Sequence, residues 1–131
     1  MQGIKKLLEP KTLLYIGICY TLLLTFLLLF PTTDVPKPDL PNFDKLGHVV
    51  LFTFLVVIWA LFAFSKTEEN RSQIVRVMLL AFVYGIIIEV LQELFFQPRT
   101  GDGWDIVANS VGILLGWFVF QKVKRIFIPK A

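Results

Sequence analysis

The sequence predicts an all-α membrane protein, a bundle of four transmembrane helices with both termini in the cytoplasm. Composition is the first indication: 56% of the 131 residues are hydrophobic and 18% are charged, whereas soluble domains have about 45–50% and 25%. The mean hydropathy is +0.70. The net charge of +3 is small and scattered, which excludes a nucleic-acid-binding protein, and the single cysteine excludes a disulfide scaffold.

Four apolar segments are the second indication, and they cover residues 12–30, 46–64, 74–96 and 104–120. A bilayer core needs roughly 17–25 helical residues to cross it, and each segment has that length. Backbone amides in hydrocarbon must be satisfied within their own segment, so the segments are helices. The longest stretch between them is too short for a soluble domain, and we therefore expect one membrane domain over residues 1–131. The first segment exceeds the length of a signal-peptide core and is expected to be retained.

The distribution of basic residues predicts the orientation. Ten of the thirteen Lys and Arg residues lie on one predicted side of the membrane, which the positive-inside rule places in the cytoplasm. They are Lys5, Lys6, Lys11, Lys66, Arg71, Arg76, Lys122, Lys124, Arg125 and Lys130. The sequence thus predicts a multi-pass protein whose connections 31–45 and 97–103 face outward.

Polar side chains gather at the predicted outer ends of three segments. A charged group at bilayer depth costs about 2.5–3.5 kcal/mol, so each one indicates a specific role. The second segment begins near Asp44, Lys45 and His48, the third carries Glu89 and Gln92, and the fourth carries Asp105 and Asn109. The outer connection adds Arg99 and Asp102. We predict that these groups line a polar pocket open to the outer face.

Small residues predict how the helices pack. Ala81 and Gly85 lead up to Glu89 at intervals of four, and Gly112 and Gly116 form a GxxxG pair on the fourth segment. Such stripes let helix backbones approach closely in lipid. We therefore expect the third and fourth segments to pack together, with Glu89, Gln92 and Asn109 near their seam. Interhelical polar contacts average only about 0.6 kcal/mol, so a purely structural role for these residues is the alternative.

The order of these motifs resembles that of the VanZ-like family of bacterial membrane proteins. The matching motifs are Asp44-Lys45-x-x-His48, Glu89-x-x-Gln92 and Arg99-x-x-Asp102-x-x-Asp105-x-x-x-Asn109-x-x-Gly112. The resemblance implies a small multi-helix protein of the bacterial cytoplasmic membrane, in a family whose founder is associated with teicoplanin resistance. It implies no established reaction. Phe52 stands where many relatives have Tyr, so this chain lacks that hydroxyl.

Two kinds of function follow from the predicted pocket. In the first, Lys45 and Arg99 hold a phosphate or carboxylate, and the partners are membrane lipids, a lipid-linked envelope precursor or a glycopeptide. In the second, Glu89 and His48 act as acid and base of a membrane-embedded enzyme. We rank binding above catalysis because no convincing nucleophile is present. The sequence favours neither a monomer nor an oligomer.

Metal binding is a weaker alternative. His48 with Glu89, Asp102 and Asp105 could supply ligands for a divalent ion. Zinc sites usually use a second His or a Cys pair, and the chain has one of each residue. We therefore expect no metal and no cofactor. We expect Cys19, in the middle of the first segment, to be a packing residue.

Overall fold

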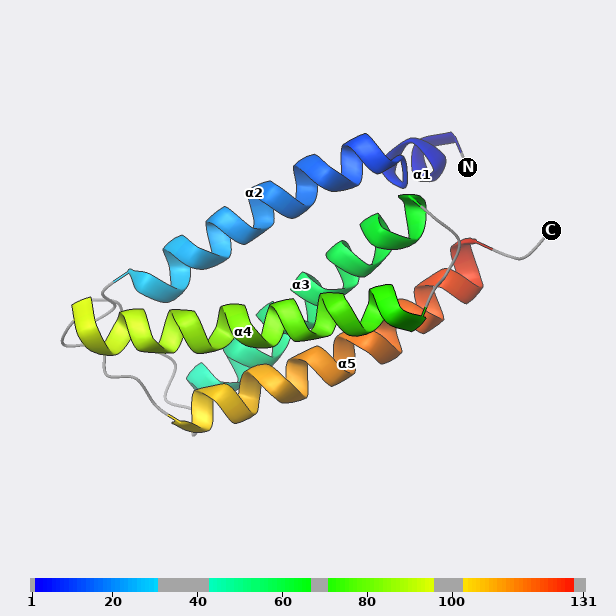
Figure 1. Ribbon diagram of the computed structural model, residues 1–131. Helices are drawn as coiled ribbons and strands as arrows, with labels where there is room; N and C mark the ends of the chain where they lie inside the picture. Colours follow the sequence, from blue (N-terminus) through cyan, green and yellow to red (C-terminus); the bar gives the residue numbers. More distant parts are fainter. Residues whose placement is uncertain (1, 31–42, 67–70, 96–102, 129–131) are drawn as a thin grey trace.

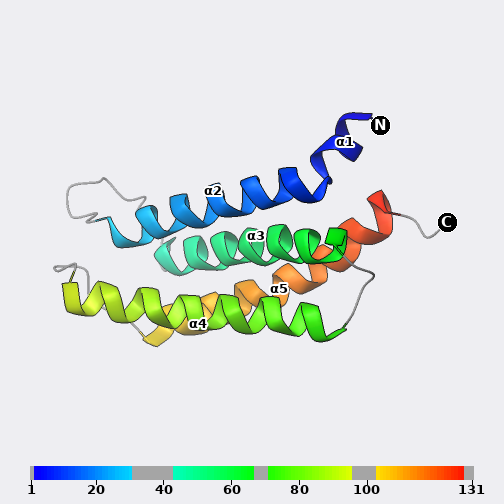
Figure 2. The same cartoon turned by 45° about the horizontal axis from the view of Figure 1, so that its top comes forward.

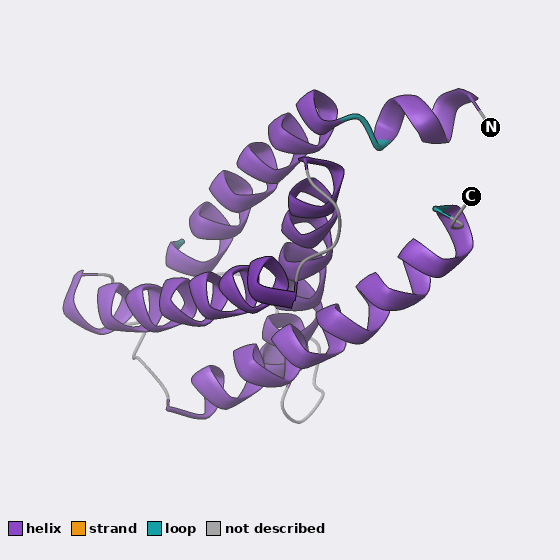
Figure 3. Ribbon diagram, turned by 45° about the vertical axis from the view of Figure 1, so that its right-hand side comes forward, coloured by secondary structure: helices purple, strands orange, loops and turns teal. Residues whose placement is uncertain are grey.

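The computed structural model describes residues 2–30, 43–66, 71–95 and 103–128, and these residues form helices without a strand among them (Figures 1 and 3). The helices are α1 (Gln2–Leu7), α2 (Pro10–Leu29), α3 (Phe43–Lys66), α4 (Arg71–Phe95) and α5 (Gly103–Phe127). The last four are long and apolar enough to cross a membrane. The predicted fold class, an all-α bundle with four membrane-spanning helices, is therefore confirmed.

Most helix ends lie within three residues of the predicted segments, and two larger differences occur. The short helix α1 precedes α2 and was not expected; Pro10, at the first position of α2, separates them, as proline is tolerated only in the first turn of a helix. Helix α5 continues past residue 120 to Phe127 and includes Lys124 and Arg125 in its last turn. Basic residues are good helix formers and are favourable at a helix C-terminus. A boundary drawn from hydropathy alone ends such a helix too early.

The long helices run alternately in opposite directions, so α3 and α5 are parallel to each other and antiparallel to α4 (Figures 1 and 2). Helices α3 and α5 form the most extensive contact in the bundle. The start of α2 and the end of α5 lie at the same end of the molecule, together with the end of α3 and the start of α4 (Figure 1). The cytoplasmic location of that end stays a prediction.

The close contact between α3 and α5 depends on two glycines. A Cβ atom at Gly112 would lie 2.5 Å from the Val49 carbonyl oxygen, and one at Gly116 would lie 2.7 Å from the Val56 Cβ. The Thr53 hydroxyl joins the two backbones by donating to the carbonyls of Val49 (2.7 Å) and Gly112 (3.1 Å). The GxxxG pair of the last helix therefore packs on α3. The expectation that this pair faces α4 was wrong, because the pattern indicates a close approach without specifying the partner.

Helix α4 also approaches α5, at a different small residue. A Cβ atom at Gly85 would lie 2.9 Å from Asn109 Nδ2 and 3.2 Å from the Phe52 ring. Phe52 is fully buried, and Ile88 packs in the same core cluster. The predicted packing of the third segment against the fourth is thus found at Gly85 and Asn109, with Phe52 of α3 beside them.

Helix α2 is fastened to the bundle by hydrogen bonds from aromatic residues. The Tyr20 hydroxyl donates to the Leu51 carbonyl (2.6 Å), and the Trp59 indole donates to the Thr21 hydroxyl (3.0 Å). The hydroxyls of Thr25 and Tyr84 also form a hydrogen bond (2.7 Å). These contacts satisfy polar groups that water cannot reach in a bilayer.

The lateral surface of the bundle, along the lengths of the helices, is apolar. Large hydrophobic side chains are exposed along every long helix, including Leu22, Phe54, Leu80 and Leu114. Soluble monomers rarely expose apolar patches this extensive, and hydrocarbon is the environment that accommodates them. Cys19 is also exposed on this surface, so its predicted packing role was wrong.

We predict that Gly112→Ala destabilises the bundle by about 1–3 kcal/mol, the usual cost of overpacking. The added methyl group meets backbone of α3, which cannot rotate away as a side chain can. Gly47→Ala is the matched control, because nothing lies within 4 Å of a Cβ at that position. Denaturant titration of the purified protein in detergent measures both. Equal stability of the two variants would contradict the close α3–α5 contact.

Candidate functional site

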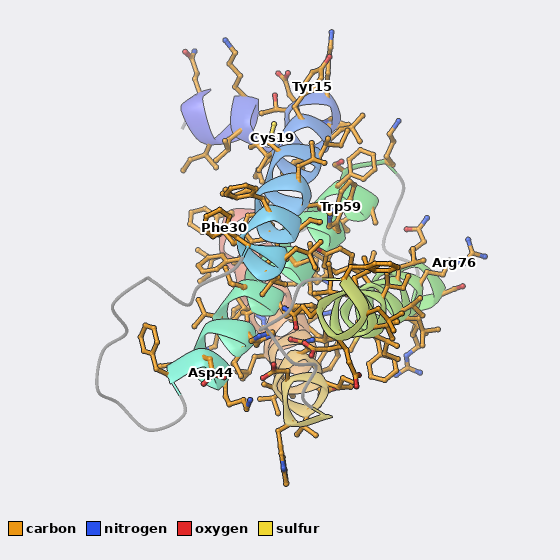
Figure 4. All side chains as sticks on the ribbon, turned by 90° about the vertical axis from the view of Figure 1, so that its left-hand side faces the viewer. Tyr15, Cys19, Phe30, Asp44, Trp59 and Arg76 are labelled. Atoms are coloured by element: carbon orange, nitrogen blue, oxygen red, sulfur yellow. The ribbon has the colours of Figure 1, made fainter. Side chains whose placement is uncertain are left out.

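Polar residues from three helices meet at the end of the bundle where α3 and α5 begin and α4 ends. Figure 4 views the bundle from that end, with Asp44 at the start of α3. We call the group formed by Lys45, His48, Glu89, Asp105 and Asn109 the polar cluster. All of its members except Lys45 are buried, with exposed fractions of 2–6%. The sequence prediction that three helices contribute polar groups at one end is met in this arrangement.

Two contacts between α3 and α5 form the centre of the polar cluster. Lys45 Nζ lies 2.6 Å from Asp105 Oδ1, and His48 Nδ1 lies 2.8 Å from Asn109 Oδ1. On each helix the two residues are one turn apart and therefore share a face. Because α3 and α5 are parallel, the contacts repeat at sequence separations of 60 and 61. The same register continues to the Thr53–Gly112 hydrogen bond, at a separation of 59.

The contact with Asn109 determines which nitrogen of His48 carries the proton. An amide oxygen can only accept a hydrogen bond, so Nδ1 of His48 is the donor. In the neutral ring the other nitrogen, Nε2, then has a lone pair. It faces Asp105 Oδ2 at 3.7 Å, beyond hydrogen-bonding distance. Asn109 thus orients the ring and leaves Nε2 able to accept a proton or bind a cation.

Lys45 connects the buried carboxylate of Asp105 to the edge of the bundle. Its ammonium group lies 2.6 Å from Asp105 Oδ1 and 3.3 Å from Asp44 Oδ2. The Asp44 side chain is 54% exposed and that of Lys45 is 23% exposed. A paired cation lowers the cost of burying Asp105, which would otherwise be large. Lys45 is therefore both the partner of a buried acid and a cation within reach of molecules outside the bundle.

Glu89 reaches the polar cluster from α4, one turn beyond Gly85. One ligand atom each from His48, Glu89 and Asp105 lies within 4.8 Å of the other two. All three side chains are buried. Because Gly85 has no side chain, α4 can lie close enough to Asn109 for Glu89 to reach the α3–α5 contacts. Glu89 therefore brings a second buried carboxylate to the group formed by His48 and Asp105.

Gln92 has a different role from the one expected. It is buried, but its Nε2 donates to the Leu28 carbonyl (2.6 Å), which joins α4 to α2. Leu28 lies in the last turn of α2, where carbonyl groups have no donor from their own helix. The Gln92 amide nitrogen therefore satisfies an end of α2, and the expectation that it lies at the seam between α4 and α5 was wrong.

Arg99 and Asp102 lie outside the described residues, so their assignment to the site stays a prediction. Ser110, a hydroxyl near the cluster in sequence, donates to the Ile106 carbonyl one turn earlier (2.8 Å). That bond occupies the hydroxyl within its own helix. Sequence reasoning missed Thr53 as a bridge between α3 and α5, because the sequence does not show that its face of α3 meets Gly112.

Two cavities in the described part of the bundle lie apart from the polar cluster. One, of about 280 Å³, is lined by apolar residues and by Thr21 and Tyr84, between α2, α3 and α4. The other, of about 490 Å³, is at the opposite end, near Lys5 and Phe127. The outward pocket expected beside His48 and Asn109 stays a prediction.

These features define a small multi-pass helical membrane protein with a buried polar cluster at one end. The family model described as VanZ/LLP1 matches residues 13–127. The chain therefore belongs to the VanZ family, as its motifs indicated, and the match includes α3, α4, α5, all of α2 except its first three residues, and every residue of the polar cluster. No curated protein and no solved structure matches the chain.

We predict that Lys45 and Asp105 are energetically coupled. Removing one partner leaves the other charge buried and uncompensated, so Lys45→Met and Asp105→Asn should each destabilise the protein. The double variant should be less destabilised than the sum, with a coupling energy of about 0.5–3 kcal/mol. Denaturant titration in detergent gives the four free energies of unfolding.

The control for this cycle is Asp44→Asn, which removes an exposed contact of the same lysine. Its effect should be within about 0.5 kcal/mol, as for other exposed sites. Strictly additive effects of Lys45→Met and Asp105→Asn would show that the two side chains do not form the pair described above.

Proposed function

We propose that the protein binds the polar head group of an anionic or amphiphilic envelope molecule at the end of the bundle that carries the polar cluster. In this way it lowers the sensitivity of a bacterium to a glycopeptide such as teicoplanin. The observation that supports the proposal is the convergence of a cation, an imidazole, an amide and two carboxylates in an otherwise apolar bundle. Membership of the VanZ family supports the association with resistance.

Lys45 is the residue best placed to contact a head group. It is partly exposed, and its contact with Asp44 (3.3 Å) is longer than its contact with Asp105 (2.6 Å). An incoming phosphate or carboxylate can replace the exposed Asp44 carboxylate while the buried pair with Asp105 is kept. Phe43 and Trp104 are exposed at the starts of α3 and α5 and offer apolar surface beside the lysine. A charged group next to apolar surface suits an amphiphile.

The second candidate is a membrane-embedded enzyme that acts on a lipid-linked phosphate or peptidyl substrate. The observation that favours it is the proximity of His48, Glu89 and Asp105, whose ligand atoms lie within 4.8 Å of one another. His48 and Glu89 would act as base and acid. The Ser110 hydroxyl is bonded within α5, which argues against a serine nucleophile and keeps binding ahead of catalysis.

We predict that expression of the chain in a susceptible bacterium raises the inhibitory concentration of teicoplanin. Glu89→Gln, His48→Ala and Asn109→Ala should each remove this protection at equal membrane abundance, because each removes a polar group of the cluster. Glu93→Gln is the matched control: it makes the same chemical change on an exposed side chain of the same helix. Protection that survives all three cluster substitutions would refute a role for the cluster in resistance.

Purified protein distinguishes binding from catalysis. Incubated with a lipid-linked phosphate or peptidyl precursor, it should retain the molecule without releasing a product, and Lys45→Met should weaken that retention. Product formation that is abolished by Glu89→Gln would replace the binding proposal with the enzymatic one.

A further inference from the structure

His48, Glu89 and Asp105 together have the composition and spacing of a metal-binding site. They offer one nitrogen and two carboxylate oxygens within 4.8 Å of one another, all from buried side chains. Two ligands of a tetrahedral zinc ion, each at about 2.1 Å from the metal, are roughly 3.4 Å apart. The distance from His48 Nε2 to Asp105 Oδ2 is 3.7 Å. We propose that these three side chains bind a divalent metal ion of the zinc class.

The orientation of His48 is independent support for this site. Metal-binding histidines usually donate the proton of their second nitrogen to a carboxylate or carbonyl group, which directs the lone pair at the metal. His48 has this arrangement, with Nδ1 bonded to Asn109 Oδ1 and Nε2 facing Asp105. Asn109 lies on α5 and is buried against Gly85 of α4, so packing fixes the side chain that orients the His48 ring.

Asp105 is arranged in the same way. Its Oδ1 accepts a hydrogen bond from Lys45, while Oδ2 points toward His48. Carboxylates that bind metals commonly have one oxygen held by such an outer contact. Lys45 therefore holds the carboxylate in place without occupying the oxygen that faces the imidazole.

The set of ligands indicates the kind of ion. Imidazole suits zinc, iron and nickel, whereas carboxylates extend the range to manganese. A site with three protein ligands leaves a position for water or for an oxygen of another molecule, as in catalytic zinc sites. Such a position lies in the same cluster as the proposed head-group site. The metal inference does not rest on that proposal, because the probe that tests it is the ion itself.

The test uses the full chain purified in detergent and stripped of metal with a chelator. Zn²⁺ is added and the bound ion is counted by mass spectrometry after desalting; Co²⁺ is added in parallel as an optical probe. We expect about one ion per chain, as the single ligand set requires. We also expect visible Co²⁺ absorption bands typical of nitrogen and oxygen ligands. Glu93→Gln should match the unaltered protein.

The variants separate direct ligands from the residue that orients the ring. His48→Ala and Glu89→Gln should abolish saturable binding and the Co²⁺ bands. Asn109→Ala should weaken the affinity by about 10–100-fold, the usual effect of losing an outer contact. Each variant is compared by size-exclusion profile and thermal stability, and Asp105→Asn, which keeps the side-chain shape, is used if His48→Ala does not fold.

Absence of saturable binding, or binding that is unchanged in both His48→Ala and Glu89→Gln, would overturn the metal site. These results are distinguishable from failure of the proposed function. A protein that binds the ion but gives no protection against teicoplanin keeps the metal site and loses the resistance role. A protein that protects against teicoplanin but shows no saturable metal binding keeps the resistance role and loses the metal site.

Discussion

The close approach of α3 and α5 is the constraint on which the rest of the structure depends. Gly112 and Gly116 have no side chains, so the two parallel helices meet along Val49, Thr53 and Val56. The same register, continued one and two turns toward the start of both helices, places His48 against Asn109 and Lys45 against Asp105. A bulkier residue at either glycine would separate the two backbones and lengthen the contacts between His48 and Asn109 and between Lys45 and Asp105. The apolar packing and the polar cluster are therefore two parts of one interface.

The polar cluster is expensive to bury, and this bears on why the chain has it. Replacing a buried ion pair with well-packed apolar residues is often neutral or stabilising, so the pair of Lys45 and Asp105 is weak evidence of a stability role. Elsewhere the described helices pack closely through glycine, alanine and aromatic residues, and uncharged groups form interhelical hydrogen bonds such as that from Gln92 to α2. Ionisable groups brought together from three helices at one end are more simply explained by a function that needs them, and for this cluster we propose head-group binding and a metal ion.

Much of the fold follows from the sequence, and the limits have physical causes. Hydropathy and length predict the four long helices because a bilayer imposes both. The same approach ends α5 too early, because its last turns are helical but basic. The small-residue pattern predicts that Gly112 and Gly116 permit a close contact, but a helix surface does not identify its partner, and the partner is α3. Gln92 was placed with Glu89 because the two are three residues apart, but its amide nitrogen donates to the Leu28 carbonyl at the end of α2. A metal site was the weaker alternative at the sequence level because zinc sites usually use a second histidine or a cysteine pair. That ligand atoms of His48, Glu89 and Asp105 lie within 4.8 Å of one another depends on the fold.

The tautomer of His48, that is, which ring nitrogen carries the proton, tests this account most directly. It is the only histidine in the chain, so its two ring nitrogens can be observed by nitrogen-15 NMR of histidine-labelled protein in bilayers without assignment. In metal-free protein, at a pH where the ring is neutral, the account predicts that the proton lies on Nδ1, and that this preference is lost in Asn109→Ala. A proton on Nε2, or a spectrum that Asn109→Ala leaves unchanged, would show that His48 does not meet Asn109 and that the polar cluster does not exist as described.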